Sequence, residues 1–458
     1  MHQDLTAGSI TGKLLRFALP MMAGNLLQQL YNVADTWVVG RFLGADALAA
    51  VGSSYTLMTF LTSILLGLCM GSGAVFSIQF GRRDHERLKN SMFLSFLLTA
   101  ALTLLLNLIS FCGLDWIIRV LQVPNQVAPL MREYLWVIFW GISATFLYNY
   151  FAALLRSIGN SATPLLFLGV SAVLNIILDL IFVLEFHWGV KGAAIATVLS
   201  QFVSGLGLAS YTLCALPELR INKRHMRWDS SIAKEISSLS LLTCVQQSIM
   251  NLGILMVQGL VNSFGAVVMA AFAAAVKIDS FAYMPVQDFG NAFSTFIAQN
   301  YGAGKQERIQ KGIRSAAACA VLFCCVISTG VCLFAKPLMG LFIQQDEREI
   351  IAAGVHYLRV EGAFYIGIGL LFLLYGFYRA VKKPGMSVIL TVISLGTRVA
   401  LAYTLSAIPK IGVTGIWAAV PIGWVLADLV GISYYAYWQK TGPGNIKIRN
   451  HHPIERKL

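Results

Sequence analysis

The sequence predicts an all-α polytopic membrane protein with twelve transmembrane helices. Three observations predict this fold class: 57% of the 458 residues are hydrophobic, only 12% are charged, and the mean hydropathy is +0.70. Soluble domains carry about 25% charged residues, so this composition excludes an ordinary soluble enzyme. A spanning helix needs about 20 apolar residues, and the chain holds enough hydrophobic residues to supply twelve such helices.

Apolar runs between polar breaks place each helix in turn, with boundaries good to about four residues. The first run is too long for the hydrophobic region of a cleavable signal, so we expect it to stay in the mature protein. In chain order, the predicted helices cover residues 14–39, 46–80, 90–113, 130–156, 163–184, 190–215, 234–262, 266–300, 312–335, 350–380, 385–408 and 412–439.

The formal net charge of +13 follows from basic residues that gather in alternate connections between these runs. This is the pattern of the positive-inside rule. It predicts a multi-pass protein of the cell's inner (plasma) membrane with both termini cytoplasmic, in contact with membrane lipid and not with nucleic acid. The eight cysteines lie in or beside apolar runs without metal-ligand spacing, so we interpret them as small apolar fillers.

An internal repeat divides the chain. At an offset of 221 residues Gly81 falls on Gly302, and at an offset of 223 Arg156 falls on Arg379. Six spans per repeat give both halves the same orientation, an arrangement that many secondary transporters use. We therefore predict an amino-terminal lobe at 1–215, a cytoplasmic linker at 216–233, a carboxy-terminal lobe at 234–439 and a basic tail at 440–458.

Polar residues in the first repeat form two stripes at helical spacing. Charge at membrane depth is costly, so each such residue is a functional hypothesis. If the stripes face each other, two carboxylates can share a proton or hold a monovalent cation; the alternative is that they only hydrogen-bond between helices. One stripe is Asn25, Gln28, Asn32 and Asp35, the other is Ser171, Asn175 and Asp179, and Thr197 adds a hydroxyl from the next helix.

The second repeat holds further ionisable and amide side chains at predicted membrane depth. Arg398 occupies the position of Asn175, so it either replaces a bound cation or braces the lobe. Glu361 and Asp428 are interpreted as packing or gating groups. Lys277 and Asp279 lie two residues apart and so do not share a helical face. Candidates for a substrate cavity are Gln28, Asn32, Gln247, Asn251, Lys277, Asp288 and Arg398.

Several motifs in this order resemble the multidrug and toxic compound extrusion (MATE) family of cation-coupled antiporters. They are PMMAGNLLQQLYNVAD from Pro20 to Asp35, QFGRRDHER and its second-half counterpart QNYGAGKQER, LLRSIGNSATP, and NIILD. The resemblance covers nearly the whole chain. It implies two six-helix lobes around a V-shaped central cavity that opens alternately to each side.

In the family's amino-lobe-coupled branch the resemblance implies a cation-coupling site, which maps to Asp35, Asn175, Asp179 and Thr197. It also implies that the first helix bends at its proline, here Pro20. The carboxy-lobe sodium-site branch carries acids where this chain has Gln246, Gln247 and the apolar run 366–370. The resemblance therefore favours coupling through the first lobe.

Together these observations predict a monomeric antiporter, not an enzyme, that exports cationic, amphipathic organic compounds in exchange for H⁺ or Na⁺. No cofactor and no dedicated metal site is expected beyond that coupling ion. The alternative is a flippase for a lipid-linked saccharide or another amphipathic lipid, which a cavity dominated by Lys277 and Arg398 would favour.

Overall fold

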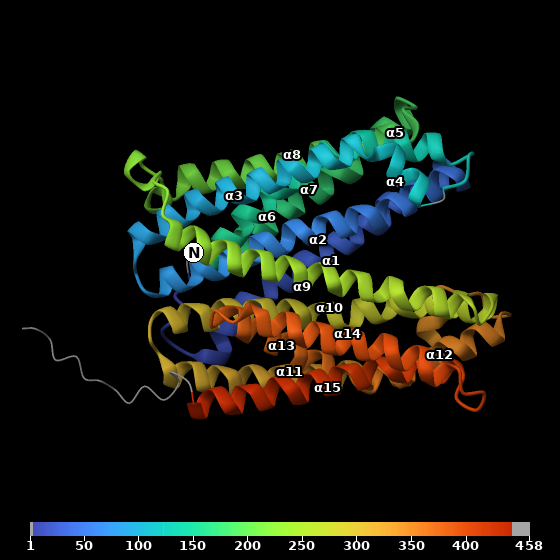
Figure 1. Ribbon diagram of the computed structural model, residues 1–458. Helices are drawn as coiled ribbons and strands as arrows, with labels where there is room; N and C mark the ends of the chain where they lie inside the picture. The colour runs from blue at the N-terminus through green and yellow to red at the C-terminus, as the bar shows by residue number, and fades with distance from the viewer. Residues whose placement is uncertain (1–2, 122, 442–458) are drawn as a thin grey trace, which may run out of the picture.

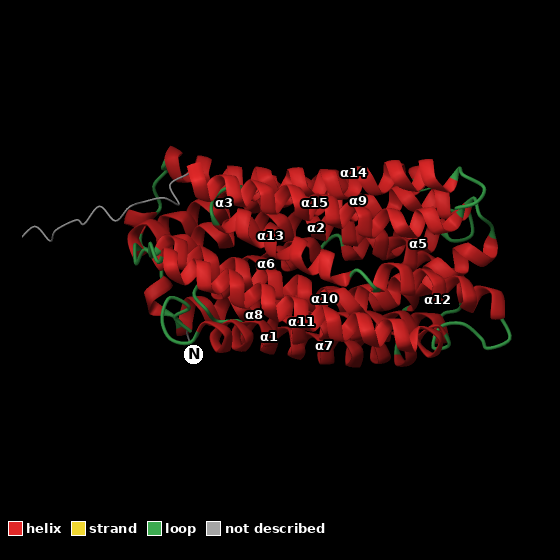
Figure 2. Ribbon diagram, turned by 90° about the horizontal axis from the view of Figure 1, so that it is seen from below, coloured by secondary structure: helices red, strands yellow, loops and turns green. Residues whose placement is uncertain are grey.

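The computed structural model describes residues 3–121 and 123–441, and all regular elements in these ranges are helical (Figure 1). The long helices run alongside one another with the loops gathered at the two ends (Figure 2). The predicted basic tail lies almost wholly outside the described residues. The elements are α1 (Ile10–Phe42), α2 (Ala45–Gly81), α3 (His85–Cys112), α4 (Leu114–Val120), α5 (Ala128–Ile138), α6 (Gly141–Ser157), α7 (Ala162–Leu180), the π-helical turn η1 (Ile181–Glu185), α8 (Gly189–Ala215), the 3₁₀ turns η2 (Pro217–Leu219) and η3 (Lys223–His225), α9 (Ser230–Asn262), α10 (Ala266–Gly302), α11 (Gln306–Met339), α12 (Arg348–Gly362), α13 (Tyr365–Ala380), α14 (Pro384–Ser406) and α15 (Val413–Thr441).

The order of helices in α1–α8 recurs in α9–α15. Helices α2 and α10 both have 37 residues, and both follow a glycine with positive φ. Each repeat also contains one bent pair, α5 with α6 at 46° and α12 with α13 at 50°. The element order thus agrees with the internal repeat in the sequence, whereas the predicted lobe boundaries stay a prediction.

Among the described residues, nine helices are long and apolar enough to cross a membrane, or up to eleven if each bent pair counts as one span. Helix α1 is 33 residues long, yet its amides and carboxylate lower its hydropathy. Twelve spans and a V-shaped cavity therefore stay predictions, while the all-helical membrane fold is confirmed.

Three local features differ from the sequence-based expectation. The runs 130–156 and 350–380 were expected to be continuous helices, but they break between α5 and α6 and between α12 and α13. Gly141 and Gly362 lie at these breaks, where a residue without Cβ weakens the helix and allows a kink. The structure also adds the short helix α4, whose seven residues are too few for a periodic apolar pattern.

The two repeats contact each other through α1, α2, α9 and α10. Helix α2 packs against both α9 and α10, and α1 packs against α10. The acidic Glu235 at the start of α9 adds a link at one end of this interface. Its carboxylate pairs with Arg87 of α3 at 3.5 Å and with Lys382, between α13 and α14, at 2.5 Å.

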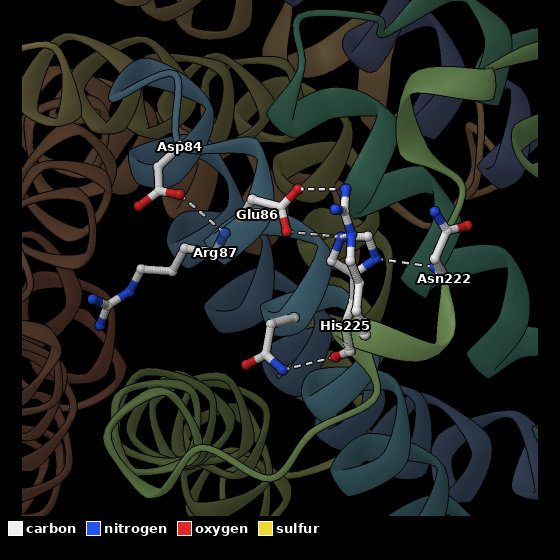
Figure 3. A network of polar contacts seen from close by, with 7 residues as sticks. Asp84, Glu86, Arg87, Asn222 and His225 are labelled. Atoms are coloured by element: carbon white, nitrogen blue, oxygen red, sulfur yellow. Dashed lines mark hydrogen bonds and ion pairs between the residues drawn. The ribbon is translucent and has the colours of Figure 1, made fainter.

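The connection between the repeats docks on the beginning of α3 (Figure 3). Nε2 of buried His225 lies 3.0 Å from Glu86 Oε2, and the Arg224 guanidinium donates to Glu86 Oε1 at 2.9 Å. The backbone N–H of Asn222 donates to Nδ1 of His225 at 3.0 Å. Asn90 donates to the carbonyls of His225 and Arg227, both at 2.8 Å. These contacts fix the connection to the first repeat.

The segment Gln3–Gly8, here called the N-terminal strap, lies across both repeats at the same end of the protein. Gln3 donates its backbone N–H to the carbonyl of Gly159 at 3.3 Å, and the Leu5 side chain is fully buried. From the start of α11, the Arg308 guanidinium donates to the carbonyls of three strap residues at 2.7–3.2 Å. The strap therefore ties the α6–α7 connection to the second repeat.

Candidate functional site

The two predicted carboxylates of the first repeat meet between α1 and α7. Asp35 extends from α1 and Asp179 from the last turn of α7, and their carboxyl groups interact directly. Asp179 is 0% exposed. Three of the four oxygens, Asp35 Oδ1 and both oxygens of Asp179, are buried and have no hydrogen-bond partner among the described residues. The helices thus hold two acids face to face with no donor between them.

An amide and a hydroxyl extend this group toward α8. Asn175 lies one turn before Asp179 on the same buried face of α7, and its Nδ2 lies 3.4 Å from Thr197 Oγ1. The Thr197 hydroxyl donates to the Ala193 carbonyl of its own helix at 3.1 Å. Asn175 Oδ1 has no partner, so it remains available as an acceptor beside the acids.

Packing of α7 against α8 positions these side chains. Ser171 Oγ donates to the carbonyl of Ser200 in α8 at 2.7 Å, which fixes the polar face of α7 toward its neighbour. All four residues that the resemblance maps to a cation-coupling site therefore lie in one region between α1, α7 and α8. Their role in coupling stays a prediction.

Tyrosines complete the surroundings of the acid pair, and the sequence analysis did not single them out. Tyr31 of α1 and Tyr134 of α5 both interact electrostatically with Asp35 and Asp179. Tyr31 precedes Asp35 by four residues, so helical spacing alone places it on the same face. Tyr134 comes from a different helix, and no pattern in the sequence points from it to the acids.

One candidate of the second repeat contacts the first repeat. Asp288 of α10 is 3% exposed, and its Oδ1 accepts a hydrogen bond from Asn25 Nδ2 of α1 at 2.5 Å. Its other oxygen has no partner among the described residues. Asn25 thus faces the partner repeat, whereas Asp35, ten residues later on α1, faces α7.

Arg398 lies apart from the acid pair, in a cavity of about 90 Å³ within the second repeat. Asp279 and Glu361 line the same cavity, so the structure gathers these three ionisable groups. Lys277 is exposed and does not line this cavity, in agreement with the expectation that it does not share a face with Asp279.

The remaining predicted residues are dispersed over the interior. Gln28 interacts with Tyr31 on α1, and Asn32 is half-buried on the same helix. Gln247 of α9 reaches Met70 of α2, with Nε2 3.9 Å from Sδ, and Asn251 donates to the Gln247 carbonyl at 3.2 Å. These residues do not form one site with the acid pair. Pro20 lies inside α1, which continues through it.

The chemistry of the acid pair follows from its geometry. Two negative charges at contact in a low-dielectric interior repel strongly, and neither acid has a basic partner within 4.0 Å among the described residues. A proton shared between the carboxyls, or a monovalent cation held by their oxygens, removes this repulsion. The arrangement is thus suited to binding one small cation.

Comparison with known proteins agrees with this fold. The MatE family model matches residues 20–181 and 241–404. A probable multidrug resistance protein, YpnP of Bacillus subtilis, is 30% identical over 437 residues, with 95% of this chain and 96% of the relative covered. The probable multidrug resistance protein NorM of Thermotoga maritima is 27% identical over 433 residues, with 92% and 90% covered.

Solved structures show the same similarity in three dimensions. A crystal structure of a MATE protein in complex with MaL6 superimposes with a TM-score of 0.89 at 25% identity, covering 96% of this chain and 99% of that one. The family model spans well over half of the chain, and it matches once in each repeat. The chain therefore belongs to the MatE family of multidrug efflux transporters, which are transport proteins rather than enzymes.

Proposed function

We propose that this protein exports cationic, amphipathic organic compounds across the inner membrane in exchange for inward flow of H⁺ or Na⁺. The coupling ion binds at Asp35, Asn175, Asp179 and Thr197. The observation that supports this proposal is the direct contact between the two carboxyl groups without a donor between them. A permanent structural role for the pair leaves such repulsion uncompensated, whereas an exchangeable cation compensates it.

Coupling requires that the ion favour one arrangement of the two repeats over the other. Helix α1 can supply this difference because it carries both Asp35, which faces α7, and Asn25, which bonds Asp288 of α10. A shift of α1 at Pro20 would alter the distance between Asp35 and Asp179 as well as the contact between repeats. Ion binding and the opening of the repeats are then linked through one helix.

The alternative flippase for a lipid-linked saccharide is not favoured. The relatives described above carry names that refer to multidrug resistance. In addition, Lys277, one of the two cations that were expected to dominate a saccharide-binding cavity, is exposed and lies outside the cavity that contains Arg398.

The test is ethidium efflux from proteoliposomes under an imposed pH gradient and, separately, an imposed sodium gradient. Wild-type protein should drive efflux under one gradient, which names the ion, and Asp35→Asn should lose it. Lys277→Gln is a matched control because Lys277 is an exposed ionisable residue of α10 away from the acid pair. Equal gradient-driven efflux in wild type and Asp35→Asn would contradict the proposal.

A further inference from the structure

The cavity of about 90 Å³ in the second repeat has no role in the proposed coupling site. Its wall is formed by α9, α10 and α12–α15, all in the second repeat. Liquid water occupies about 30 Å³ per molecule, so the space corresponds to roughly three waters. It is large enough for a small organic group but too small for a whole drug.

Two acids in this wall lack partners. Asp279 of α10 is 4% exposed and Glu361 of α12 is 2% exposed. Asp279 Oδ1 and Glu361 Oε2 are both buried without a hydrogen-bond partner among the described residues. A buried carboxylate oxygen that accepts no hydrogen bond is costly unless a bound group compensates it.

Arg398 only partly balances these acids. It interacts electrostatically with both, but it forms no ion pair within 4.0 Å with either in the described part of the chain, and its Nε also lacks a partner. Two carboxylates and one guanidinium leave a formal charge of minus one. The cavity is therefore short of one positive charge.

Aromatic rings line the rest of the cavity. Tyr283, Tyr357 and Trp424 border it together with the two acids. Faces of Trp and Tyr attract organic cations through the ring quadrupole, and this combination with a carboxylate is typical of sites for quaternary ammonium groups. A metal ion of similar charge instead prefers a shell of oxygen ligands.

The acids are not a relic of the duplication. Offsets of 221 and 223 residues place Met58 and Ile138 of the first repeat opposite Asp279 and Glu361, and Asn175 opposite Arg398. The first repeat therefore has apolar side chains where the second has both acids. The charged cavity is a property of the second repeat alone.

From these observations we propose that the cavity formed by Asp279, Glu361 and Arg398 binds the ammonium group of a small organic cation. Asp279 and Glu361 supply the counter-charge, and Tyr283, Tyr357 and Trp424 supply the ring faces. This binding site is separate from the Asp35–Asp179 pair and does not depend on which ion drives transport.

Calorimetric titration of the purified full-length protein with choline tests the proposal, at fixed pH and ionic strength. The matched probe is 3,3-dimethylbutan-1-ol, which has the shape of choline but no charge. Wild-type protein should bind choline at least tenfold more tightly than the neutral alcohol. Equal binding of the two probes, or no binding of choline, would overturn the proposal without relying on any variant.

Variants then locate the binding site. Asp279→Asn and Glu361→Gln should each weaken choline binding at least tenfold, whereas Lys277→Gln, on the same helix but outside the cavity wall, should not change it. Thermal unfolding of each variant confirms that it is folded. Unchanged binding in both acid variants would place the cation elsewhere and overturn the proposal.

Asp35→Asn separates this proposal from the proposed function. It should bind choline like wild type even where gradient-driven efflux is lost. Loss of choline binding in Asp35→Asn would assign the cation to the first repeat and contradict the second site.

Discussion

Gly81 and Gly302 occupy equivalent positions at the ends of α2 and α10, and each touches the backbone of the other helix. A Cβ at Gly81 would overlap the carbonyl of Gln299, and a Cβ at Gly302 would overlap the carbonyl of Ile78. Positions 78 and 299 are themselves 221 residues apart, the same offset that relates the two glycines. The two repeats thus meet here through a reciprocal contact, as expected for a pseudo-two-fold axis.

This contact predicts that Gly81→Ala and Gly302→Ala both destabilise the protein. Overpacking of a tight contact costs about 1–3 kcal/mol, and here the obstacle is backbone that cannot rotate away. Thermal unfolding in detergent should show a lower melting temperature for each variant. The matched control is Gly396→Ala in α14, where a Cβ meets nothing within 4 Å; a loss as large in the control would refute the steric explanation.

The hydrogen bond between Asn25 and Asp288 predicts a second effect on stability. Asn25→Ala removes the donor at 2.5 Å from a buried carboxylate, which costs about 1–3 kcal/mol when an acceptor is left unsatisfied. In the double variant Asn25→Ala with Asp288→Ala the loss should be smaller than the sum of the two single losses. Additive losses in thermal unfolding would show that the two side chains are not coupled.

The N-terminal strap predicts a local change in protection. Arg308→Ala removes the donors to the carbonyls of Leu5, Ala7 and Gly8. Hydrogen exchange of residues 3–8 should therefore accelerate. Lys311→Ala is the control, because Lys311 pairs only with exposed Glu307 one turn away. Equal exchange in wild type and Arg308→Ala would mean that the strap is held by other contacts.

The strap also carries a pH dependence through Asp4. Partial burial raises the pKa of this carboxyl, but two hydrogen bonds from Thr6 and the charges of Lys13 and Lys305 outweigh it, so the pKa lies below the ordinary value of 3.8. A lowered pKa stabilises the folded strap above that value, and the stabilisation is lost as the pH falls through the lowered pKa. Asp4→Asn should exchange faster than wild type at pH 6 and similarly to it below the folded pKa. A difference that persists at the lowest pH would contradict this account.

The sequence predicts faces of helices well and partners poorly. Spacing on one helix places Asn175 and Asp179 on a single stripe, and the structure confirms that both are buried on α7. The contact between Asn25 and Asp288 joins residues 263 positions apart. Periodicity shows that each faces the interior, but not that they meet, because helix packing is decided by the whole bundle.

The second-repeat cavity illustrates the same limit. Asp279, Glu361 and Arg398 come from three helices, and each was a separate isolated charge in the sequence. The bend between α12 and α13 was also missed, because apolar residues continue through Gly362 and give no polar break. Only the folded chain brings these charges to one cavity.

The most direct test of the central claim compares two assays on Asp35→Asn and Asp179→Asn in proteoliposomes. One is efflux of ethidium against its gradient driven by an ion gradient; the other is exchange of labelled for unlabelled ethidium without any ion gradient. If the acid pair binds the coupling ion, both variants should lose the driven efflux and retain the exchange. Driven efflux at the wild-type rate in both variants would contradict coupling through Asp35 and Asp179.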